Sequence, residues 1–287
     1  MTRLPIHNLV YDVGLFDGSD TAYYLHRGYS VVAIDANPQM IEAAKQKFAD
    51  AISSGRLKLL NVGLSDRAGK AIFWVSDEPV WSSFNRDIAS RDGKRHRAVD
   101  VPVVPFEDIL AEHGVPFYLK VDIEGNDSLC IKALSRIENR PLYVSAESEC
   151  VGDDERPSDE EALEMLHLLH DAGYRHFKLL DQSSRCAIRA GRLSSFRVRL
   201  IHNLAHGRLK RPIVSTIAAK MTDAASIRRR TKFDFAPGSS GPLGPELPGA
   251  WMTFDQAETV YLRERRRHFA SRSMPTYSFW CDWHATV

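Results

Sequence analysis

Short apolar runs of strand length alternate with amphipathic segments along roughly the first 180 residues of the chain. The runs LVYDV (9–13), VVAI (31–34) and LKLLNV (57–62) are almost entirely apolar. This is typical of strands that are buried on both faces of a parallel sheet. The same reasoning predicts further strands at 71–75, 99–104, 117–122, 142–147 and 175–180.

Helix signals separate these strands. Asn37 followed by Pro38 is a capping residue before a first-turn proline, and it predicts a helix to about residue 52. Ser158 and Glu161 have the spacing of a capping box before an amphipathic stretch that ends at Gly173. Further helices are predicted over 19–27, 105–113 and 127–138. The alternation predicts an α/β, Rossmann-like fold whose mostly parallel sheet has helices on both faces.

The alternation ends after residue 181. Residues 185–232 contain 13 lysines and arginines and the single acid Asp223, and residues 236–249 are rich in glycine and proline. A helix capped by Thr253 and Gln256 follows, and the aromatic segment 277–287 is strand-like. We therefore predict a core of residues 1–184 that is completed by 277–287 as the last of seven core strands. Residues 185–276 are predicted to be an insertion that caps the acceptor.

Composition limits the class of protein. Apolar residues make up 44% and charged residues 26% of the chain, as in soluble globular proteins. No apolar run is long enough to predict a transmembrane helix, and the N-terminal segment does not resemble a secretory signal. The four cysteines have no metal-binding spacing, so we expect reduced thiols in a cytoplasmic protein. We predict no metal site: Asp122, Glu147 and Glu149 are read as solvated carboxylates in preference to magnesium ligands.

The turn after the first strand is the first candidate for ligand binding, because open α/β sheets bind ligands at the carboxyl ends of their strands. Asp12, Gly14 and Gly18 form an Asp-x-Gly-x-x-x-Gly pattern there, and Asp35 ends the second strand. A dinucleotide motif would have three glycines and no acid before them. An acid at the first strand end favours a cationic ligand, and Asp35 is positioned to accept hydrogen bonds from ribose hydroxyls.

At these residues the chain resembles the FkbM family of methyltransferases. The matching segments are VYDVGLFDGSDT (10–21), VVAIDANP (31–38), NVGLSDRAGKAIFWVS (61–76), VPVVPFEDIL (101–110) and FYLKVDIEG (117–125). The last of these, a strand that ends in Lys-x-Asp-x-Glu-Gly, is the most distinctive. The resemblance implies a methyltransferase fold, S-adenosylmethionine as cofactor and O-methylation of a hydroxyl, often on a sugar or a natural-product scaffold. Family members more often have Asn-x-Gly where this chain has Phe16-Asp17-Gly18.

The resemblance also implies roles for individual residues. Residues of the first turn would hold the methionine half of the cofactor, Asp35 the ribose, and residues after the third strand the adenine. Asp122 and Glu124 would face the methyl group and the acceptor. The complete predicted cofactor set is Asp12, Gly14, Asp17, Gly18, Thr21, Asp35, Asn37, Asn61 and Val62.

Methyl transfer needs an aligned nucleophile and a group that takes or orients its proton. Asp122 and Glu124 are the first candidates for that group. His284 is the second, because Trp280, Asp282 and His284 lie on one face of the last predicted strand and Asp282 could orient the imidazole.

Two other classes of protein stay open. A nucleotide-dependent oxidoreductase would use the same fold, although the third glycine is missing. A non-catalytic module could bind an anionic partner through the basic residues 185–232. We expect a small hydroxylated acceptor, for which the basic block also allows a negative charge, and no membrane partner. We expect no nucleic acid, because no nucleic-acid motif accompanies the basic block. The resemblance also allows a homodimer.

Overall fold

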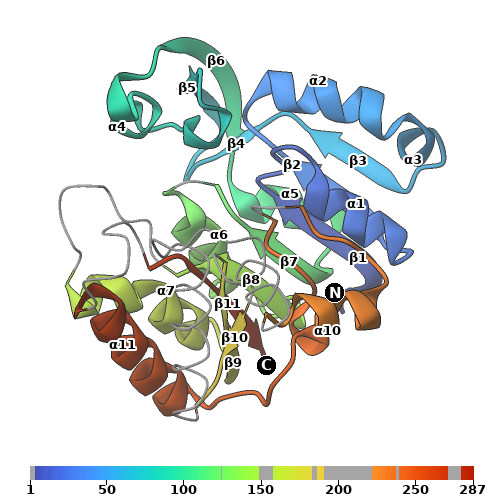
Figure 1. Ribbon diagram of the computed structural model, residues 1–287. Helices are drawn as coiled ribbons and strands as arrows, with labels where there is room; N and C mark the ends of the chain where they lie inside the picture. The colour runs from blue at the N-terminus through green and yellow to red at the C-terminus, as the bar shows by residue number, and fades with distance from the viewer. Residues whose placement is uncertain are drawn as a thin grey trace, which may run out of the picture. The chain divides into compact units, whose positions relative to one another are not determined.

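The computed structural model describes residues 4–123, 125–148, 158–182, 186–190, 222–236, 239–270 and 279–287 (Figure 1). The chain forms two compact units, and each is described by itself. Unit 1 contains residues 1–144 and 235–239, and unit 2 contains residues 145–234 and 240–287.

The four main strands of unit 1 are parallel. They are β1 (Ile6–Val13), β2 (Ser30–Ile34), β3 (Leu57–Leu60) and β7 (Pro116–Val121), in the order β7-β1-β2-β3. Each was predicted from its apolar run. All four carboxyl ends therefore lie at the same edge, which is where ligands bind in sheets of this class.

Helices cover both faces of these strands. Tyr11 of β1 donates a hydrogen bond to the Gly114 carbonyl and packs edge-on against Phe106 of helix α5 (Phe106–His113). Tyr118 of β7 points to the opposite face, since Tyr11 is paired with its neighbour Leu119, and its ring meets Tyr24 of α1 (Ser19–His26). The predicted two-sided coverage is confirmed. The remaining helices of this part are α2 (Pro38–Lys47), α3 (Ala49–Ser53) and α6 (Asp127–Leu134).

The helix predicted from 38 to 52 consists of two helices. Asn37 caps α2 as predicted, with its side chain accepting from the Gln39 N–H at 3.0 Å. The chain leaves helical geometry at Phe48 (φ −117°, ψ 26°), between α2 and α3. No glycine or proline marks this break, so the sequence pattern gave no sign of it.

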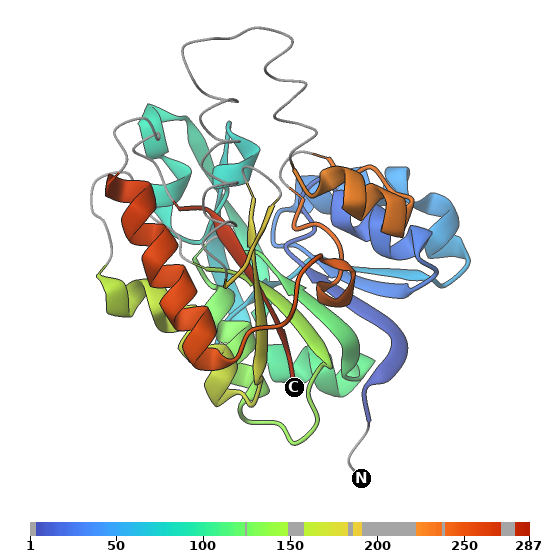
Figure 2. The same ribbon diagram turned by 60° about the horizontal axis from the view of Figure 1, so that its bottom comes forward.

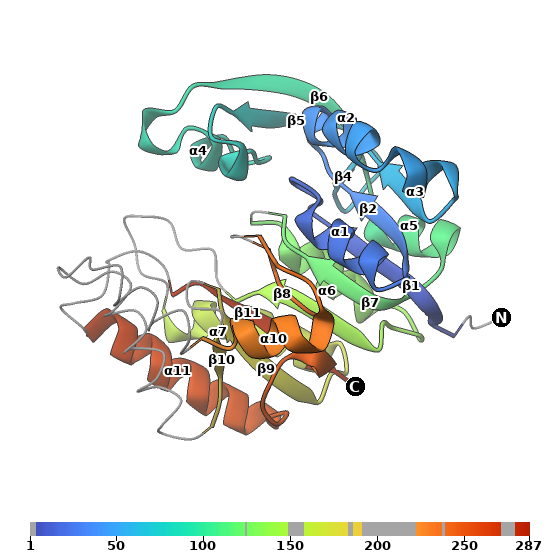
Figure 3. The same ribbon diagram turned by 45° about the vertical axis from the view of Figure 1, so that its right-hand side comes forward.

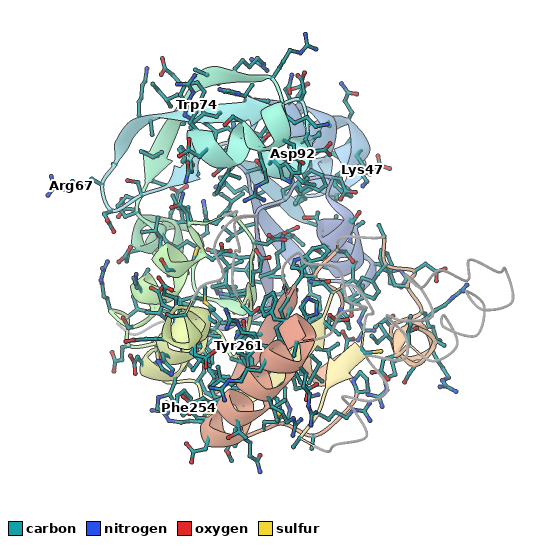
Figure 4. The ribbon with its side chains drawn as sticks, turned by 60° about the vertical axis from the view of Figure 1, so that its left-hand side comes forward. Lys47, Arg67, Trp74, Asp92, Phe254 and Tyr261 are labelled. Atoms are coloured by element: carbon teal, nitrogen blue, oxygen red, sulfur yellow. The ribbon has the colours of Figure 1, made fainter. Side chains whose placement is uncertain are left out.

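Unit 1 also contains a smaller sheet, β4-β6-β5, which Figure 3 shows extending away from the parallel strands of the same unit. Its strands are β4 (Gly63–Leu64), β5 (Gly69–Ser76) and β6 (His96–Val104). Between β5 and β6 lie the short helices η1 (Pro79–Trp81), α4 (Arg86–Ala89) and η2 (Arg91–Gly93). A small core of Phe73, Val75, Val101 and Val103 holds this sheet together. Trp74, which is labelled in Figure 4, belongs to strand β5 of the same sheet.

Unit 2 is built around β8 (Tyr143–Glu147), β9 (His176–Asp181), β10 (Cys186–Ile188) and β11 (Cys281–Thr286), in the order β8-β11-β9-β10. The boundary between the units falls inside β8. Strand β9 runs antiparallel to both β10 and β11. The prediction that the chain returns to the sheet with its last strand is confirmed.

The helices of unit 2 are α7 (Asp159–Asp171), α10 (Ala224–Thr231) and α11 (Phe254–Ala270), with the short helix η3 (Gly244–Glu246). Both predicted capping boxes form: Ser158 with Glu161, and Thr253 with Gln256. Figure 2 shows α11 running beside the strands of its own unit.

The main sheet has eight strands among the described residues, so the predicted count of seven is wrong by one. The additional strand is β10, which continues antiparallel from β9. It contains three residues at the start of the basic block, too few for a period-two pattern to stand out. Thus the first residues of the predicted insertion 185–276 belong to the sheet; residues 191–221, most of the basic block, lie outside the described part of the chain.

Candidate active site

The turn after β1 brings the tips of three strands together. Gly14 has φ +87°, and its N–H donates to the Ile34 carbonyl of β2 at 2.9 Å. A Cβ atom on Gly14 would lie 1.7 Å from the Asp122 carbonyl oxygen. Gly18 has φ +74°, and a Cβ there would lie 2.6 Å from the Phe48 ring. Both glycines are therefore required by close approach of neighbouring atoms as well as by backbone conformation.

Asp35 follows β2 with its carboxylate held in one orientation. One oxygen accepts from the Phe16 N–H and the other from the Asn37 N–H, each at 2.8 Å. Burial raises the pKa of Asp35 to about 6, although these two hydrogen bonds oppose the shift. The residue is only partly buried, and each oxygen accepts one hydrogen bond here, which leaves it a second lone pair that a ligand hydroxyl can use. Phe16 reaches Asp35 with φ +48°, a strained conformation for a residue with a side chain.

Asn61 supports the backbone beside Asp35. Its side-chain amide donates to the carbonyls of Asp35 and Ala36 at 2.9 and 3.1 Å. Asn61 and Val62 are both partly buried at the end of β3. They are therefore placed at the tip of the strand beside β2, where the resemblance puts the adenine.

Asp12 lies at the centre of a buried ionic group that we name the Lys120 cluster: Lys120, Asp12, Asp20, Asp122 and the Gly14 carbonyl. The Lys120 ammonium donates to the Gly14 carbonyl at 2.6 Å and lies 3.2 Å from Asp12. It is 3.5 Å from Asp122 and 3.9 Å from Asp20. The Asp12 side chain has 0% of its surface exposed, so it offers no surface to a ligand in this structure.

The charges in this cluster support each other. Burial alone would lower the pKa of Lys120, but the carboxylates of Asp12, Asp122 and Asp20 together raise it well above its usual value. Lys120 is therefore an ammonium at every physiological pH. Of the three acids, only Asp122 is substantially exposed, with 36% of its side-chain surface free against 7% for Asp20.

Three further residues of the predicted cofactor set, Thr21, Asp17 and Asn37, have partners within the protein. Thr21 is buried and donates to Asp12 at 2.6 Å. Asp17 is exposed and accepts from the N–H and hydroxyl of Ser19, both at 2.8 Å. Asn37 is buried as the cap of α2. Glu124 lies outside the described residues.

His284 belongs to β11 of unit 2 and is completely buried. Burial, with a contribution from Lys178, lowers its pKa to about 3. The expected pairing with Asp282 does not form: Asp282 accepts from Gln182, and neither ring nitrogen of His284 has a hydrogen-bond partner among the described residues. An imidazole of such low pKa is a weak base, so its catalytic role stays a prediction that the structure does not strengthen.

The sequence reasoning missed Lys120 and Asp20. A signal for Lys120 was available, because LVYDV (9–13) and FYLKV (117–121) each contain one charged residue inside an apolar run. Charges on strands buried on both faces must be paired. The register confirms this, since Asp12 is directly opposite Lys120.

Within the described ranges, no group of three or more His, Cys, Asp or Glu side chains is arranged to hold a metal ion. The three cysteines described there, Cys130, Cys186 and Cys281, are buried. No helix in the same ranges combines the length and the apolar character that a membrane span requires.

Comparison with protein families places the chain. The family model of the methyltransferase FkbM domain matches residues 12–176, which is more than half of the sequence. The chain belongs to this family. The match contains every element of the parallel core from Asp12 onward, including the Gly14 turn, Asp35 and the Lys120 cluster. Search of the curated proteins gives no match.

Several solved structures are similar to the chain at low identity. The precorrin-6y C5,15-methyltransferase of Geobacter metallireducens GS-15 is 13% identical (TM-score 0.33; 62% of this chain and 70% of that one). The MccD protein is 9% identical (TM-score 0.38; 98% and 90%). The [4+2]-cyclase SpnF is 15% identical (TM-score 0.33; 80% and 73%). Likeness at this level bears on neither substrate nor reaction.

The family implies a cofactor of the S-adenosylmethionine type, and the described residues fit one. Asp35 presents an oriented carboxylate for ribose hydroxyls, the Gly14 turn lies next to it, and Asp122 supplies an accessible negative charge. Asp12 and Thr21 do not fit direct contacts, because both are completely buried and are hydrogen-bonded to each other.

Proposed function

We propose that this methyltransferase transfers the methyl group of S-adenosylmethionine to a hydroxyl of a small acceptor, such as a sugar, a nucleotide-sugar or a natural-product scaffold. The observation that carries the proposal is the pair of partly exposed carboxylates at the tips of β2 and β7, the two strands on either side of β1. Asp35 is oriented by two backbone N–H groups, and Asp122 stands beside the Gly14 turn with 36% of its side chain exposed. This arrangement suits a ligand with a diol at one end and a positive charge at the other.

S-adenosylmethionine, when bound, supplies a methyl group that its sulfonium already activates. The protein therefore has mainly to align the acceptor oxygen, which is worth about 7–11 kcal/mol of barrier in well-oriented reactions. Asp35 would hold the ribose, and the turn from Gly14 to Gly18 would lie beside the rest of the cofactor.

Asp122 would serve the acceptor side. The hydroxyl proton has to leave as the oxygen gains its methyl group, and a carboxylate at this tip is placed to accept or orient it. Such assistance contributes roughly 10²–10⁴-fold in rate. Residues 185–276 are proposed to form the acceptor-binding region. Its described part includes α10, where Arg228 pairs with Asp234 at 2.9 Å.

Calorimetry with S-adenosylhomocysteine tests the cofactor half of the proposal. We expect the wild type to bind and Asp35→Ala to bind at least about tenfold more weakly, because hydrogen bonds to a charged group are lost. The exposed Asp66→Ala variant is the matched control. No binding by the wild type, or equal binding by Asp35→Ala, would contradict the proposal. A thermal shift with nicotinamide dinucleotides alone would favour an oxidoreductase instead.

The pH dependence of the same binding gives a second check. Asp35 has a pKa near 6, so protonation below that pH removes a lone pair and weakens ribose binding. We expect affinity to fall as pH drops from 7 to about 5. The Asp35→Asn variant should bind weakly with no such fall.

Transfer of labelled methyl groups to a panel of acceptors tests the reaction. Hydroxylated sugars, nucleotide-sugars and phenols are expected to accept the label, whereas matched primary amines are not. Asp122→Asn should lower turnover by roughly 10²–10⁴-fold. Labelling of the amines alone would exclude O-methylation.

A further inference from the structure

Asp12 is the acid that the motif offers for the ligand's positive charge, yet it is the acid least able to reach a ligand. Its side chain is 0% exposed, and its two oxygens face the Thr21 hydroxyl and the Lys120 ammonium. A ligand atom could touch it only if this pair opened. The carboxylate is therefore already neutralised inside the protein.

Lys120 joins parts of the site that are distant in sequence. Its ammonium binds the Gly14 carbonyl, which lies in the turn after β1, and lies 3.5 Å from Asp122, just after β7. The same ammonium is 3.9 Å from Asp20 in the first turn of α1. A single buried cation thus fixes the cofactor turn and the accessible acid relative to each other.

The net charge of the cluster still favours a cation. Three carboxylates surround one ammonium, and Asp122 is the member with exposed surface. The negative charge available to a ligand is thus presented at Asp122, where Lys120 holds it.

We propose that Lys120 is a positioning residue for the cofactor, that Asp12 acts through Lys120 and not by contact with the ligand, and that Asp122 meets the ligand's positive charge. This inference rests on the proposed function, since it concerns the same cofactor. It differs from the motif-based expectation in moving the cation contact from Asp12 to Asp122.

A double-mutant cycle distinguishes direct contact of Asp12 with the ligand from an effect of Asp12 through Lys120. The variants are Asp12→Asn, Lys120→Met and the double variant Asp12→Asn/Lys120→Met, which leaves the net charge of the protein unchanged. Lys58→Met is the control, since Lys58 lies on β3 of the same sheet with 52% of its side chain exposed. Titration calorimetry with S-adenosylmethionine and with S-adenosylhomocysteine gives the affinities, and urea unfolding reports whether each variant is folded.

We expect Lys120→Met to bind S-adenosylmethionine at least about tenfold more weakly than the wild type does. The double variant should have the same affinity as Lys120→Met, because Asp12 has no further role in binding once the ammonium is gone. Both should lose more affinity for S-adenosylmethionine than for the homocysteine compound, which lacks the sulfonium charge. If Lys120 had a purely structural role, its loss would lower stability and leave the ratio of the two affinities, for S-adenosylmethionine and for S-adenosylhomocysteine, unchanged. Lys58→Met should match the wild type.

Two results would overturn the inference alone. One is wild-type affinity in the double variant. The other is a double variant weaker than Lys120→Met by the full factor of Asp12→Asn, which would mean direct contact by Asp12. If Lys120→Met fails to fold, the double variant decides: weak binding with a lowered preference for the sulfonium supports the inference, and an unchanged preference overturns it. A wild type that binds neither compound would instead overturn the proposed function.

Discussion

Two buried lysines, one in each unit, show how differently a protein can accommodate the same side chain. Lys120 of β7 is surrounded by Asp12, Asp20 and Asp122. Lys178 of β9 meets no carboxylate in the described residues: it donates to the carbonyls of Gly244 and Leu247 at 2.9 and 2.7 Å. Both are almost inaccessible, with 2% and 5% of their surface exposed.

Their pKa values move in opposite directions for this reason. The carboxylates hold the pKa of Lys120 well above its usual value despite burial. Burial lowers the pKa of Lys178 to about 8, and Arg230 and Arg189 add to the shift. The Lys178 ammonium also lies 4.6 Å from the centre of the Trp251 ring. Lys120 belongs to an ionic group at the candidate active site, whereas Lys178 fastens the glycine- and proline-rich loop of its own unit to β9.

The largest expected difference is in the cost of removing each ammonium. Lys120→Met leaves Asp12 as a buried, uncompensated charge, and should lower the free energy of unfolding by about 3–5 kcal/mol. Lys178→Met leaves only neutral carbonyls without a donor, and should cost about 1–3 kcal/mol. Urea unfolding at pH 7 measures both. Equal losses would mean that the carboxylates matter no more than the carbonyls.

The glycines whose carbonyls bind these lysines give the next comparison. Gly14→Ala places Cβ 1.7 Å from the Asp122 carbonyl oxygen at φ +87°, a backbone collision that should cost about 2–4 kcal/mol. In Gly244→Ala the nearest atom is the edge of the Trp251 ring at 2.7 Å. That side chain can shift, so we expect about 1–2 kcal/mol. Gly28→Ala, at φ +86° with nothing within 4 Å, separates the cost of conformation from that of collision.

The contributions of the two lysines to the free energy of unfolding should depend differently on pH. Lys178 titrates near 8 when folded and near 10.4 when unfolded, so the unfolded chain binds more protons between these values. Its contribution to stability therefore rises with pH across that window, by at most about 1.4 kcal/mol per pH unit. The folded pKa of Lys120 is raised, so its contribution is fully present below about pH 10.4 and is lost only as pH rises above that value.

The difference between wild type and Lys178→Met should accordingly grow from pH 8 to pH 10, whereas the difference for Lys120→Met should stay constant. Unfolding in urea at four pH values within this window would show it. A flat Lys178 series would indicate that the ammonium stays charged through its contact with Trp251.

The smallest effect is expected at His284, which is directly opposite Lys178 in the pairing of β11 with β9. Its ring is neutral at pH 7 and has no hydrogen-bond partner in the described residues. Replacement by phenylalanine removes no hydrogen bond, so His284→Phe should change stability by less than about 1 kcal/mol. Methyl transfer should stay near the wild-type rate. A loss of more than about 100-fold with unchanged stability would instead make His284 the base.

Local patterns were enough to predict most of the fold. Apolar runs identified the main strands except β10, and the pairs Asn37–Pro38, Ser158–Glu161 and Thr253–Gln256 marked helix starts that the structure confirms. These signals depend on neighbours in sequence. The break at Phe48 and the three residues of β10 depend on tertiary packing, which a local pattern does not contain.

The candidate site was predictable to a similar depth. Motif spacing located the Gly14 turn and Asp35 at adjacent strand tips, and the structure brings them together. Motif spacing did not predict that Asp12 is enclosed, because the enclosure depends on which residue of the neighbouring strand lies opposite Asp12. The residue opposite Asp12 is Lys120. Lys120 is part of the Lys-x-Asp-x-Glu-Gly motif, but the motif alone predicts no function for the lysine.

The pairing of Asp12 with Lys120 has a consequence for how the sheet assembles. In the native alignment of β1 with β7 the two charges are opposite each other, with Tyr11 facing Leu119 and Val13 facing Val121 on either side. Sliding one strand by a single residue would leave an aspartate and a lysine each opposite an apolar neighbour in the interior. Two hydrophobic strands would otherwise tolerate several alignments, so this ion pair selects one of them while the chain folds.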